Sequence, residues 1–461
     1  MSGILKHSLL KTFDGSGRQP RPLQVEALGW IADNCSSPGL AIQAGTGTGK
    51  QAIARALQIA TGGAILVPNN ALVDQAQETY PNLNTLKGAE HYKCGIGGDH
   101  EDCTDCGYAK AKQRARSGEP TLFNPLSYVY SGCYTDTVIV DEAHKLEGFL
   151  RLLITYKFSQ LKYSPPKNAD AAWVARKAQE YNRIGSVYKE RKEMKKAAQA
   201  FQQGKRLGFI ADQMKTKPND FVTYFDDQNA FVVEPIEVPR EVFERALGKA
   251  KKVILLSATI PPRWAAKVLG HRSFKYLDMP SPIPKENRKV LYRPAGLKAS
   301  SSPLEVAQWI KKQLEEHKGN AIVHTTYSMG LELAKFFPGA LVHTKQTKQS
   351  TLTKFKRDGG LWIAAGASEG IDLAGETGRV NLVPILPFAN NRNPLGAALF
   401  ERDPFNYYLE TAVQFVQQCG RTTRGSDDWS VTVCGDNRLS WLLQKCDKEL
   451  PKYFKEQIQW R

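Results

Sequence analysis

Residues Ala44–Gln51, with the sequence Ala-Gly-Thr-Gly-Thr-Gly-Lys-Gln, have the residue types of a phosphate-binding loop. They follow the apolar run Leu40–Ile42 and precede a helical pattern, which is the strand, loop and helix context that such a loop requires. Glycines let backbone N–H groups turn toward an anion, the helix N-terminus adds positive potential, and Lys50 reaches the outer phosphates. We therefore predict a nucleoside triphosphate site, formed by Gly45, Thr46, Gly47, Thr48, Gly49, Lys50 and Gln51.

Gln51 departs from this pattern, because a phosphate-binding loop normally has a Ser or Thr at this place, whose hydroxyl binds magnesium. Two alternatives stay open at the level of sequence. Magnesium is held either through the carbonyl of the Gln51 side chain, or through other oxygen ligands and water alone.

The acidic pair Asp141 and Glu142 directly follows the apolar run Thr137–Val140. An acidic pair at the C-terminal end of a strand lies where α/β sheets bind their ligands. Asp141 is suited to hold Mg²⁺, directly or through water, and Glu142 to orient and polarise an attacking water. The pair therefore predicts hydrolysis of the bound triphosphate.

Two arginines, Arg421 and Arg424, lie three residues apart near the C-terminal end of the chain, in the pattern Gln-x-x-Gly-Arg-x-x-Arg. This spacing places them close to one helical face. Arginines supplied from a second domain neutralise the charge that develops on a transferring phosphoryl group. We predict that both complete the catalytic site.

Apolar runs that alternate with helical patterns in two blocks must position these side chains. Short continuous apolar strands separated by helices predict parallel sheets that are covered on both faces. The connector Asp278–Pro284 contains three prolines and divides the blocks. Candidate strands lie at Leu40–Gln43, Ala64–Val67, Val138–Val140 and Val253–Leu256, and then at Ala321–His324, Leu341–His343, Leu361–Ala364, Val380–Val383 and Val431–Val433.

The charge of the chain predicts a polyanionic partner. Its 461 residues carry a formal net charge of +17 at a pI near 9.4, and the segment from Arg151 to Asp220 holds 16 Lys and Arg against 6 Asp and Glu. No apolar run approaches the roughly 20 residues of a membrane span, and the N-terminus lacks the pattern of a secretory signal. We expect a cytoplasmic protein without membrane contact, whose eight cysteines are reduced thiols or metal ligands.

The ordered motifs resemble those of superfamily 2 helicases, and within them the DinG/XPD family of DNA helicases. The set consists of GTGTGK, Asp-Glu-Ala-His at Asp141–His144, Ser-Ala-Thr at Ser257–Thr259, and the Gln417–Arg424 segment. Further similar segments are Arg21–Gln24, Val67–Asn70 with Gln75, Glu234–Ile236, Ala367–Asp372 and Leu386–Phe388.

This resemblance implies an α/β fold of two RecA-like parallel-sheet domains. The first would comprise residues 1–87, 126–149 and 229–277, interrupted by a cysteine-rich metal-binding insertion at 88–125 and a helical arch at 150–228. The second would be a helicase C-terminal domain at 278–461.

The resemblance further implies an ATP-dependent DNA helicase that moves 5′ to 3′ on single-stranded DNA or a forked duplex, as a monomer, in DNA repair or replication. In this family the Gln24 position reads the adenine edge, and the positions of Glu369 and Asp372 couple nucleotide to strand binding. Two alternatives are an RNA or RNA–DNA hybrid remodelling helicase, and a nucleic-acid clamp with impaired ATP hydrolysis, which Gln51 favours.

The cysteine insertion has a metal-ligand pattern, because the Cys103–Cys106 pair has CxxC spacing and Cys94 lies nine residues upstream. The resemblance implies a 4Fe–4S cluster on four cysteines. The fourth ligand is expected to be Cys133, or else His91 or His100 in a three-Cys, one-His site. Zn²⁺ suits these ligands equally well, so both metals stay open.

Overall fold

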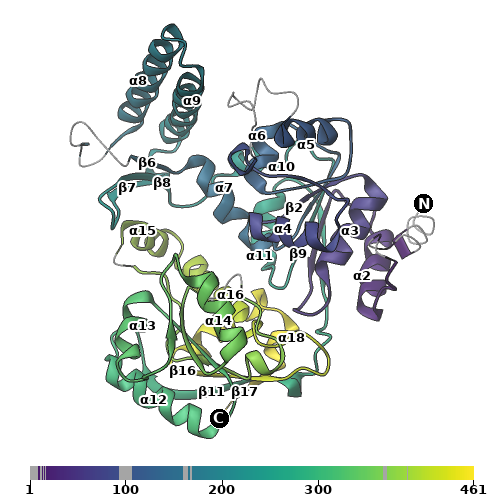
Figure 1. Ribbon diagram of the computed structural model, residues 1–461, viewed down its shortest axis with the longest axis vertical. Helices are drawn as coiled ribbons and strands as arrows, with labels where there is room; N and C mark the ends of the chain where they lie inside the picture. Colours follow the sequence, from purple (N-terminus) through teal and green to yellow (C-terminus); the bar gives the residue numbers. More distant parts are fainter. Residues whose placement is uncertain are drawn as a thin grey trace.

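The computed structural model describes residues 9–10, 13, 15, 17–92, 106–158, 165–166, 169–366, 371–391 and 393–460. Within them, two seven-stranded parallel sheets lie one above the other, and a helical hairpin projects away from both (Figure 1). The predicted α/β class with two RecA-like parallel-sheet domains is thus confirmed.

The first sheet has the strand order β10-β1-β9-β5-β2-β4-β3. Its central strands are buried apolar segments whose side chains alternate between two cores. Ala41 packs in the core on one face, whereas Leu40 and Ile42 pack in the core on the other. The strands are β1 (Gly39–Gln43), β2 (Ala64–Leu66), β3 (Asn84–Leu86), β4 (Thr121–Phe123), β5 (Thr137–Val140), β9 (Lys252–Ser257) and β10 (Phe274–Asp278).

Helices cover both faces of this sheet, as expected when parallel strands are joined by crossover connections (Figure 1). They are α2 (Pro22–Asp33), α3 (Lys50–Thr61), α4 (Asn70–Thr79), α5 (Gly107–Arg116), α6 (Pro125–Ser131), α7 (Leu146–Ile154), α10 (Arg240–Leu247) and α11 (Pro262–Leu269). Short 3₁₀ turns lie at Ala89–His91 and Ala143–Lys145.

The second sheet has the strand order β13-β14-β12-β15-β16-β11-β17. Its strands are β11 (Arg288–Leu297), β12 (Ala321–Thr325), β13 (Leu341–Val342), β14 (Leu361–Ala365), β15 (Val380–Val383), β16 (Ser430–Asp436) and β17 (Ile458–Gln459). Its helices are α12 (Pro303–Glu316), α13 (Tyr327–Ala334), α14 (Lys348–Asp358), α15 (Pro394–Arg402), α16 (Pro404–Cys419), α17 (Leu439–Lys445) and α18 (Lys452–Lys455).

The two insertions differ in detail from the predicted segments. Within 88–125, α5 packs on β3, and β4 pairs with β2 and β3 inside the main sheet. Within 150–228, the hairpin of α8 (Ala171–Glu190) and α9 (Met194–Thr216) has a root formed by a small antiparallel sheet. This root sheet consists of β6 (Tyr156–Phe158), β7 (Phe221–Phe225) and β8 (Phe231–Pro235).

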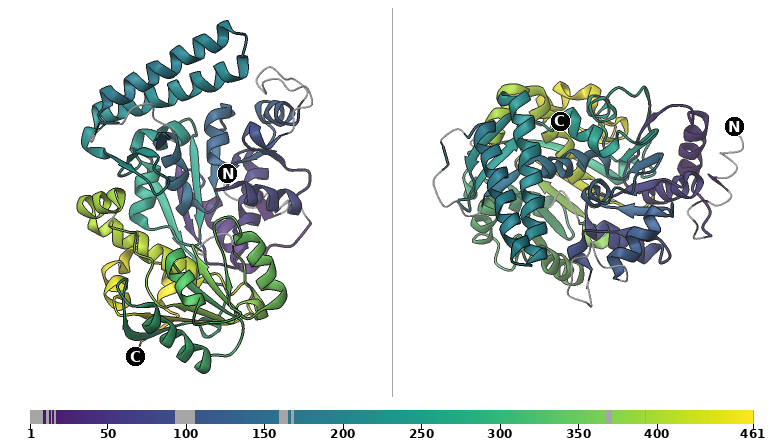
Figure 2. Two further views of the ribbon diagram at one scale, coloured as in Figure 1. Left: turned by 60° about the vertical axis from the view of Figure 1, so that its left-hand side comes forward. Right: turned by 90° about the horizontal axis from the view of Figure 1, so that it is seen from above.

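The hairpin root touches the second domain. Arg402 at the end of α15 forms an ion pair with Asp220 at 2.8 Å and also donates to the Asn219 carbonyl at 2.5 Å. Figure 2 shows the hairpin at the far side of the first domain from the second sheet, so this contact is made by its root and not by its helices. No helix of the described chain is long and apolar enough to cross a membrane.

Candidate nucleotide site between the two domains

The predicted phosphate loop connects β1 to α3 at the edge of the first sheet that faces the second domain. Gly47 and Gly49 have φ of 86° and 80°, a left-handed conformation that glycine adopts without a steric penalty. Thr48 Oγ1 donates to the Gly45 carbonyl at 2.7 Å, and Lys50 Nζ donates to the Ala44 carbonyl at 3.2 Å. The loop is therefore held in a turn with Lys50 folded over it, which fits a bound phosphate chain.

Gln24 lies against this loop at the start of α2. Its Oε1 accepts from the Arg21 backbone N–H at 2.8 Å, and its Nε2 donates to the Gly49 carbonyl at 3.4 Å. The Arg21 guanidinium donates to the Gly47 carbonyl at 3.1 Å. The structure thus places the predicted adenine-reading residue beside the phosphate loop, where it fixes α2 to the nucleotide site.

Asp141 and Glu142 follow β5, which is separated from β1 only by β9. Glu142 has a φ of 48°, and its N–H donates to Asp141 Oδ1 at 2.9 Å. Burial, with the neighbouring Glu142 charge, raises the pKa of Asp141 to about 7. Burial would also raise the pKa of Glu142, but Lys50, His144 and Arg421 outweigh it and hold that pKa at about 2. Lys50, His144 and Arg421 therefore favour the ionised form of Glu142 over that of Asp141.

His144 connects this acidic pair to the next motif. Its Nδ1 lies 2.6 Å from Ser257 Oγ at the end of β9 and 3.5 Å from Glu142 Oε2. Glu142 Oε2 itself is buried and makes no hydrogen bond to any described residue. A buried carboxylate oxygen without a hydrogen bond requires a hydrogen-bond donor. A water molecule positioned to attack a phosphate would be such a donor.

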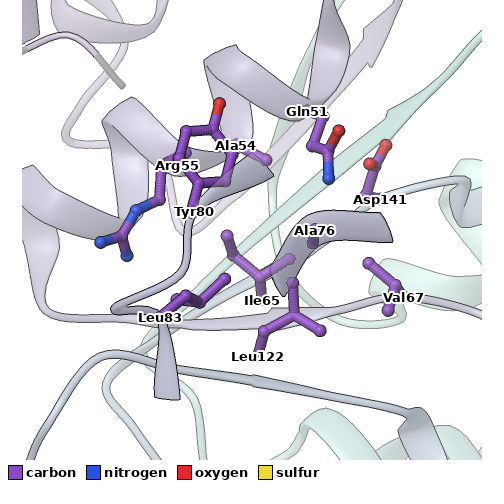
Figure 3. A pocket seen from close by; sticks show the side chains of 10 residues that line it. All are labelled: Gln51, Ala54, Arg55, Ile65, Val67, Ala76, Tyr80, Leu83, Leu122 and Asp141. Atoms are coloured by element: carbon purple, nitrogen blue, oxygen red, sulfur yellow. The ribbon is translucent and has the colours of Figure 1, made fainter. Parts of the chain in front are cut away.

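Gln51 lies next to Asp141 in a small cavity of about 10 Å³, which has room for about one water molecule. Figure 3 shows the Gln51 amide and the Asp141 carboxylate at one end of this cavity, while the Arg55 guanidinium points away from both. An amide oxygen, a carboxylate and a water are all ligands that Mg²⁺ accepts. Asp141 with Gln51 would therefore be the residues that hold a magnesium ion at this end of the cavity, while most of the other lining residues are apolar.

The second domain reaches the loop through the last turn of α16 and the segment that follows it. Gln417 Nε2 donates to Thr259 Oγ1 of the first domain at 3.0 Å, and Arg421 donates to Gln417 Oε1 at 3.3 Å. A Cβ added to Gly47 would lie 2.5 Å from the Arg424 carbonyl oxygen. The two domains are thus closed directly over the phosphate loop, and Arg421 is near enough to lower the pKa of Glu142.

The two predicted arginines differ in their surroundings. Arg421 is half-buried and continues the series of hydrogen bonds from Thr259 through Gln417, whereas the Arg424 side chain pairs with Asp372 at 2.5 Å on the surface. Arg424 thus contributes its carbonyl to the loop contact and its guanidinium to Asp372. The predicted coupling residue Glu369 lies outside the described residues.

Three residues of this site were not given a role from sequence: His144, Gln417 and Tyr453. The Tyr453 hydroxyl donates to the Ala258 carbonyl at 3.0 Å, and an added Cβ on Gly45 would lie 3.5 Å from the Tyr453 ring. Tyr453 therefore covers the phosphate loop from near the C-terminal end of the chain. His144 and Gln417 belong to motifs that the sequence shows, so a role for them could have been inferred. Tyr453 belongs to no motif, so the sequence does not indicate its place in the site.

The structure describes two of the four predicted cysteine ligands, since Cys94 and Cys103 lie outside the described residues together with His100. The Cys106 thiol caps α5 by accepting from the Ala109 N–H at 3.4 Å. The Cys133 thiol packs in the first core and donates to the Lys112 carbonyl at 3.9 Å. No group of three metal-ligating side chains occurs among the described residues, and two thiols alone do not complete a cluster or zinc site.

Comparisons with known proteins agree with this architecture. A family model described as "Helicase C-terminal domain" matches residues 305–457. The "ATP-dependent DNA helicase YoaA" of Escherichia coli (strain K12) is 27% identical over 190 residues, which cover 37% of this chain and only 30% of that relative.

Solved structures share the fold over almost the whole chain. The structure titled "XPD_Helicase" has a TM-score of 0.60 at 13% identity and covers 97% of both chains. The "Structure of S. tokodaii Xpd4" has a TM-score of 0.58 at 13% identity, covering 95% of this chain and 99% of that one. The family match, the helicase relative and the shared fold agree with the resemblance of this chain to DinG/XPD-type helicases of superfamily 2.

Proposed function

We propose that this protein hydrolyses ATP between its two domains and uses the cycle to move along single-stranded DNA. The observation that supports this most directly is the surrounding of Glu142. Its carboxylate is held ionised by Lys50 from the phosphate loop and by Arg421 from the second domain. Hydrolysis would then require domain closure, which is the property of a motor.

In this mechanism each residue has one task. The phosphate loop binds the triphosphate, and Lys50 stabilises the charge on the outer phosphates. Glu142 orients the attacking water through its unbonded Oε2 and accepts its proton. Arg421 stabilises charge on the transferring phosphoryl group, held in place by Gln417. Magnesium, when bound at Asp141 and Gln51, supplies further charge neutralisation.

Two variants test this proposal by the rate of ATP hydrolysis with and without single-stranded DNA. Lys50→Ala removes the phosphate contact, and Glu142→Gln removes the base while keeping the size of the side chain. Both should reduce strand-stimulated hydrolysis by at least about a hundredfold, because each removes charge that acts in the transition state. Hydrolysis that survives both changes would refute the assignment of the site.

DNA is favoured as the substrate because a similar protein is titled an ATP-dependent DNA helicase. The alternative function is remodelling of RNA or RNA–DNA hybrids. It is distinguished from action on DNA by comparing how strongly DNA and RNA strands of one sequence stimulate ATP hydrolysis. The proposed 5′ to 3′ direction requires that duplexes with a 5′ single-stranded tail unwind and those with a 3′ tail do not. A clamp without turnover would bind both strands and hydrolyse ATP with neither.

A metal centre on Cys94, Cys103, Cys106 and Cys133 stays a separate prediction. Metal analysis of the purified protein tests it. Iron with broad visible absorbance indicates the 4Fe–4S cluster, zinc in a colourless protein indicates the alternative, and absence of both metals removes the prediction.

A further inference from the structure

A buried histidine, His324, lies near the C-terminal end of β12, an inner strand of the second sheet. It is 2% exposed, and neither of its ring nitrogens makes a hydrogen bond to a described residue. A neutral imidazole carries one donor and one acceptor, and buried groups of this kind are normally satisfied. Because inner strands of parallel sheets are normally apolar, two unsatisfied nitrogens at this place indicate a polar task for the side chain.

The side chain of His324 lies on the same face of the sheet as that of Asn381 in β15. Ile322 of β12 is opposite Asn381 in the register, and side chains two residues apart on one strand point to the same face. His324 and Asn381 are therefore diagonal neighbours across the two strands. Asn381 is fully buried, and its Oδ1 has no hydrogen-bond partner among the described residues. An N–H group of His324 would satisfy this acceptor.

Asn381 also contacts the segment that carries Arg421. Its Nδ2 donates to Thr432 Oγ1 at 2.9 Å and to the Gln418 carbonyl at 3.1 Å. Gln418 belongs to the last turn of α16, and its carbonyl also accepts from the backbone N–H of Arg421 at 3.3 Å. The Asn381 side chain and the Arg421 backbone thus meet at one oxygen atom, which connects the neighbour of His324 to the arginine of the nucleotide site.

The surroundings of His324 keep its imidazole neutral. Burial lowers the pKa of His324 to about 3, the Asn381 side chain opposes this shift, and the positive charges of Arg421 and Lys348 add to it. A neutral imidazole can accept a hydrogen bond from a nearby cation, whereas an imidazolium would repel it. Lys348 Nζ donates to the Gly366 carbonyl at 3.0 Å in an exposed hydrogen bond. Arg421, with several N–H donors on one guanidinium, is therefore the more suitable donor to His324.

We propose that His324 is a positioning residue for Arg421. When nucleotide is bound, one ring nitrogen of His324 donates to Asn381 Oδ1, and the other accepts a hydrogen bond from the Arg421 guanidinium. Two side chains, Gln417 and His324, then hold the guanidinium, and its remaining N–H groups are directed to the transferring phosphoryl group. The inference rests on the proposed function, in which Arg421 stabilises charge on that group.

His324→Phe tests the proposal, because it removes both ring nitrogens and keeps a flat ring. At saturating ATP and single-stranded DNA, the turnover number of ATP hydrolysis should fall about 10- to 160-fold, the range for loss of one hydrogen bond to a charged group. The KM for ATP should change less than about threefold, since Arg421 acts mainly in the transition state. The melting temperature should not fall, because unsatisfied polar atoms are replaced by apolar ones.

Two further variants distinguish positioning of Arg421 from a structural effect. His324→Gln keeps a donor and an acceptor, so it should hydrolyse ATP at least about threefold faster than His324→Phe. When His324→Phe is added to Arg421→Ala, turnover should fall by no more than about twofold further, because the residue that His324 positions is already absent.

His343→Phe is the matched control. His343 is a second buried histidine of the same domain, but its two ring nitrogens have partners, since Nδ1 accepts from Trp362 at 3.1 Å and Nε2 lies 3.0 Å from the Ala365 carbonyl oxygen. Its replacement should lower the melting temperature, because it leaves the Trp362 N–H unsatisfied, and should keep turnover within about threefold of the unaltered protein.

Four results would overturn the inference. They are turnover of His324→Phe within about threefold of the unaltered protein, an effect of this change that multiplies with that of Arg421→Ala, an equal loss of turnover in His343→Phe, and a loss that His324→Gln shares together with a lower melting temperature. Arg421→Ala alone distinguishes failure of the proposed function. Unchanged hydrolysis in that variant refutes the role of Arg421, whereas reduced hydrolysis with normal turnover in His324→Phe refutes only the positioning role.

Discussion

We expect coupling between the domains to depend on the side chain of Gln417. It is 8% exposed and joins Thr259 of the first domain, which is fully buried, to Arg421 of the second. Gln417→Ala would remove the hydrogen bond to Thr259, worth about 0.5–1.5 kcal/mol, and a hydrogen bond to a charged group worth about 1.5 kcal/mol. The closed arrangement should therefore lose roughly 2–3 kcal/mol, which corresponds to a fall in turnover of about 30- to 160-fold.

The assay is the rate of ATP hydrolysis at saturating single-stranded DNA, together with ATP affinity and melting temperature. Hydrolysis should fall by the stated factor, while ATP affinity changes less than about tenfold because the phosphate loop belongs to the first domain. Gln313→Ala is the control, since Gln313 is a similarly buried glutamine in α12 of the second domain. Turnover within threefold of the unaltered protein, at a normal melting temperature, would refute the proposed coupling through Gln417.

Further predictions concern the loop, the domain contacts and pH. Gln51→Thr restores a hydroxyl beside Asp141 and should lower several-fold the magnesium concentration that half-saturates hydrolysis; an unchanged requirement would show that Gln51 takes no part in holding the ion. Gly47→Ala places a methyl group against the Arg424 carbonyl and should reduce hydrolysis more than about tenfold, whereas hydrolysis at the normal rate would contradict the closed arrangement. Burial, with repulsion from Glu147, raises the pKa of Glu410 from 4.5 to about 7. Ionisation of Glu410 therefore opposes folding increasingly as pH rises from 4.5 to 7, and fully above 7. Glu410→Gln should raise the melting temperature at pH 8 but not at pH 4.5, and equal shifts at both would contradict this cause.

Much of the nucleotide site was predictable because its residues follow strands directly. Asp141 and Ser257 stand at the C-terminal ends of β5 and β9, and the loop that leads to Lys50 follows the neighbouring strand β1; parallel strands bring these ends to one side of the sheet. These residues therefore come together in the fold however far apart they lie in the sequence. The fold class was predictable for the same reason, since continuous apolar strands indicate a sheet covered on both faces.

Other parts depend on packing that no local pattern specifies. Strand β4 has only three residues, too few for a period to be recognised, so its place in the main sheet was not predicted. The antiparallel sheet at the hairpin root was missed because β6 is equally short and its neighbour β8 lies more than 70 residues away. Tyr453 reaches the phosphate loop only through the folding of the second domain, and an isolated tyrosine carries no signal of that contact.

The contact between Arg402 and the hairpin root at Asp220 has a thermodynamic consequence. Where closure of the domains over ATP makes this contact, closure and the position of the hairpin are coupled through it. A coupling free energy between two sites acts equally in both directions. A ligand that binds the hairpin and favours the Arg402 contact would therefore tighten ATP binding by some factor. ATP would tighten binding of that ligand by the same factor. The length of strand or the partner held at the hairpin would then set the nucleotide affinity of a site that it never touches.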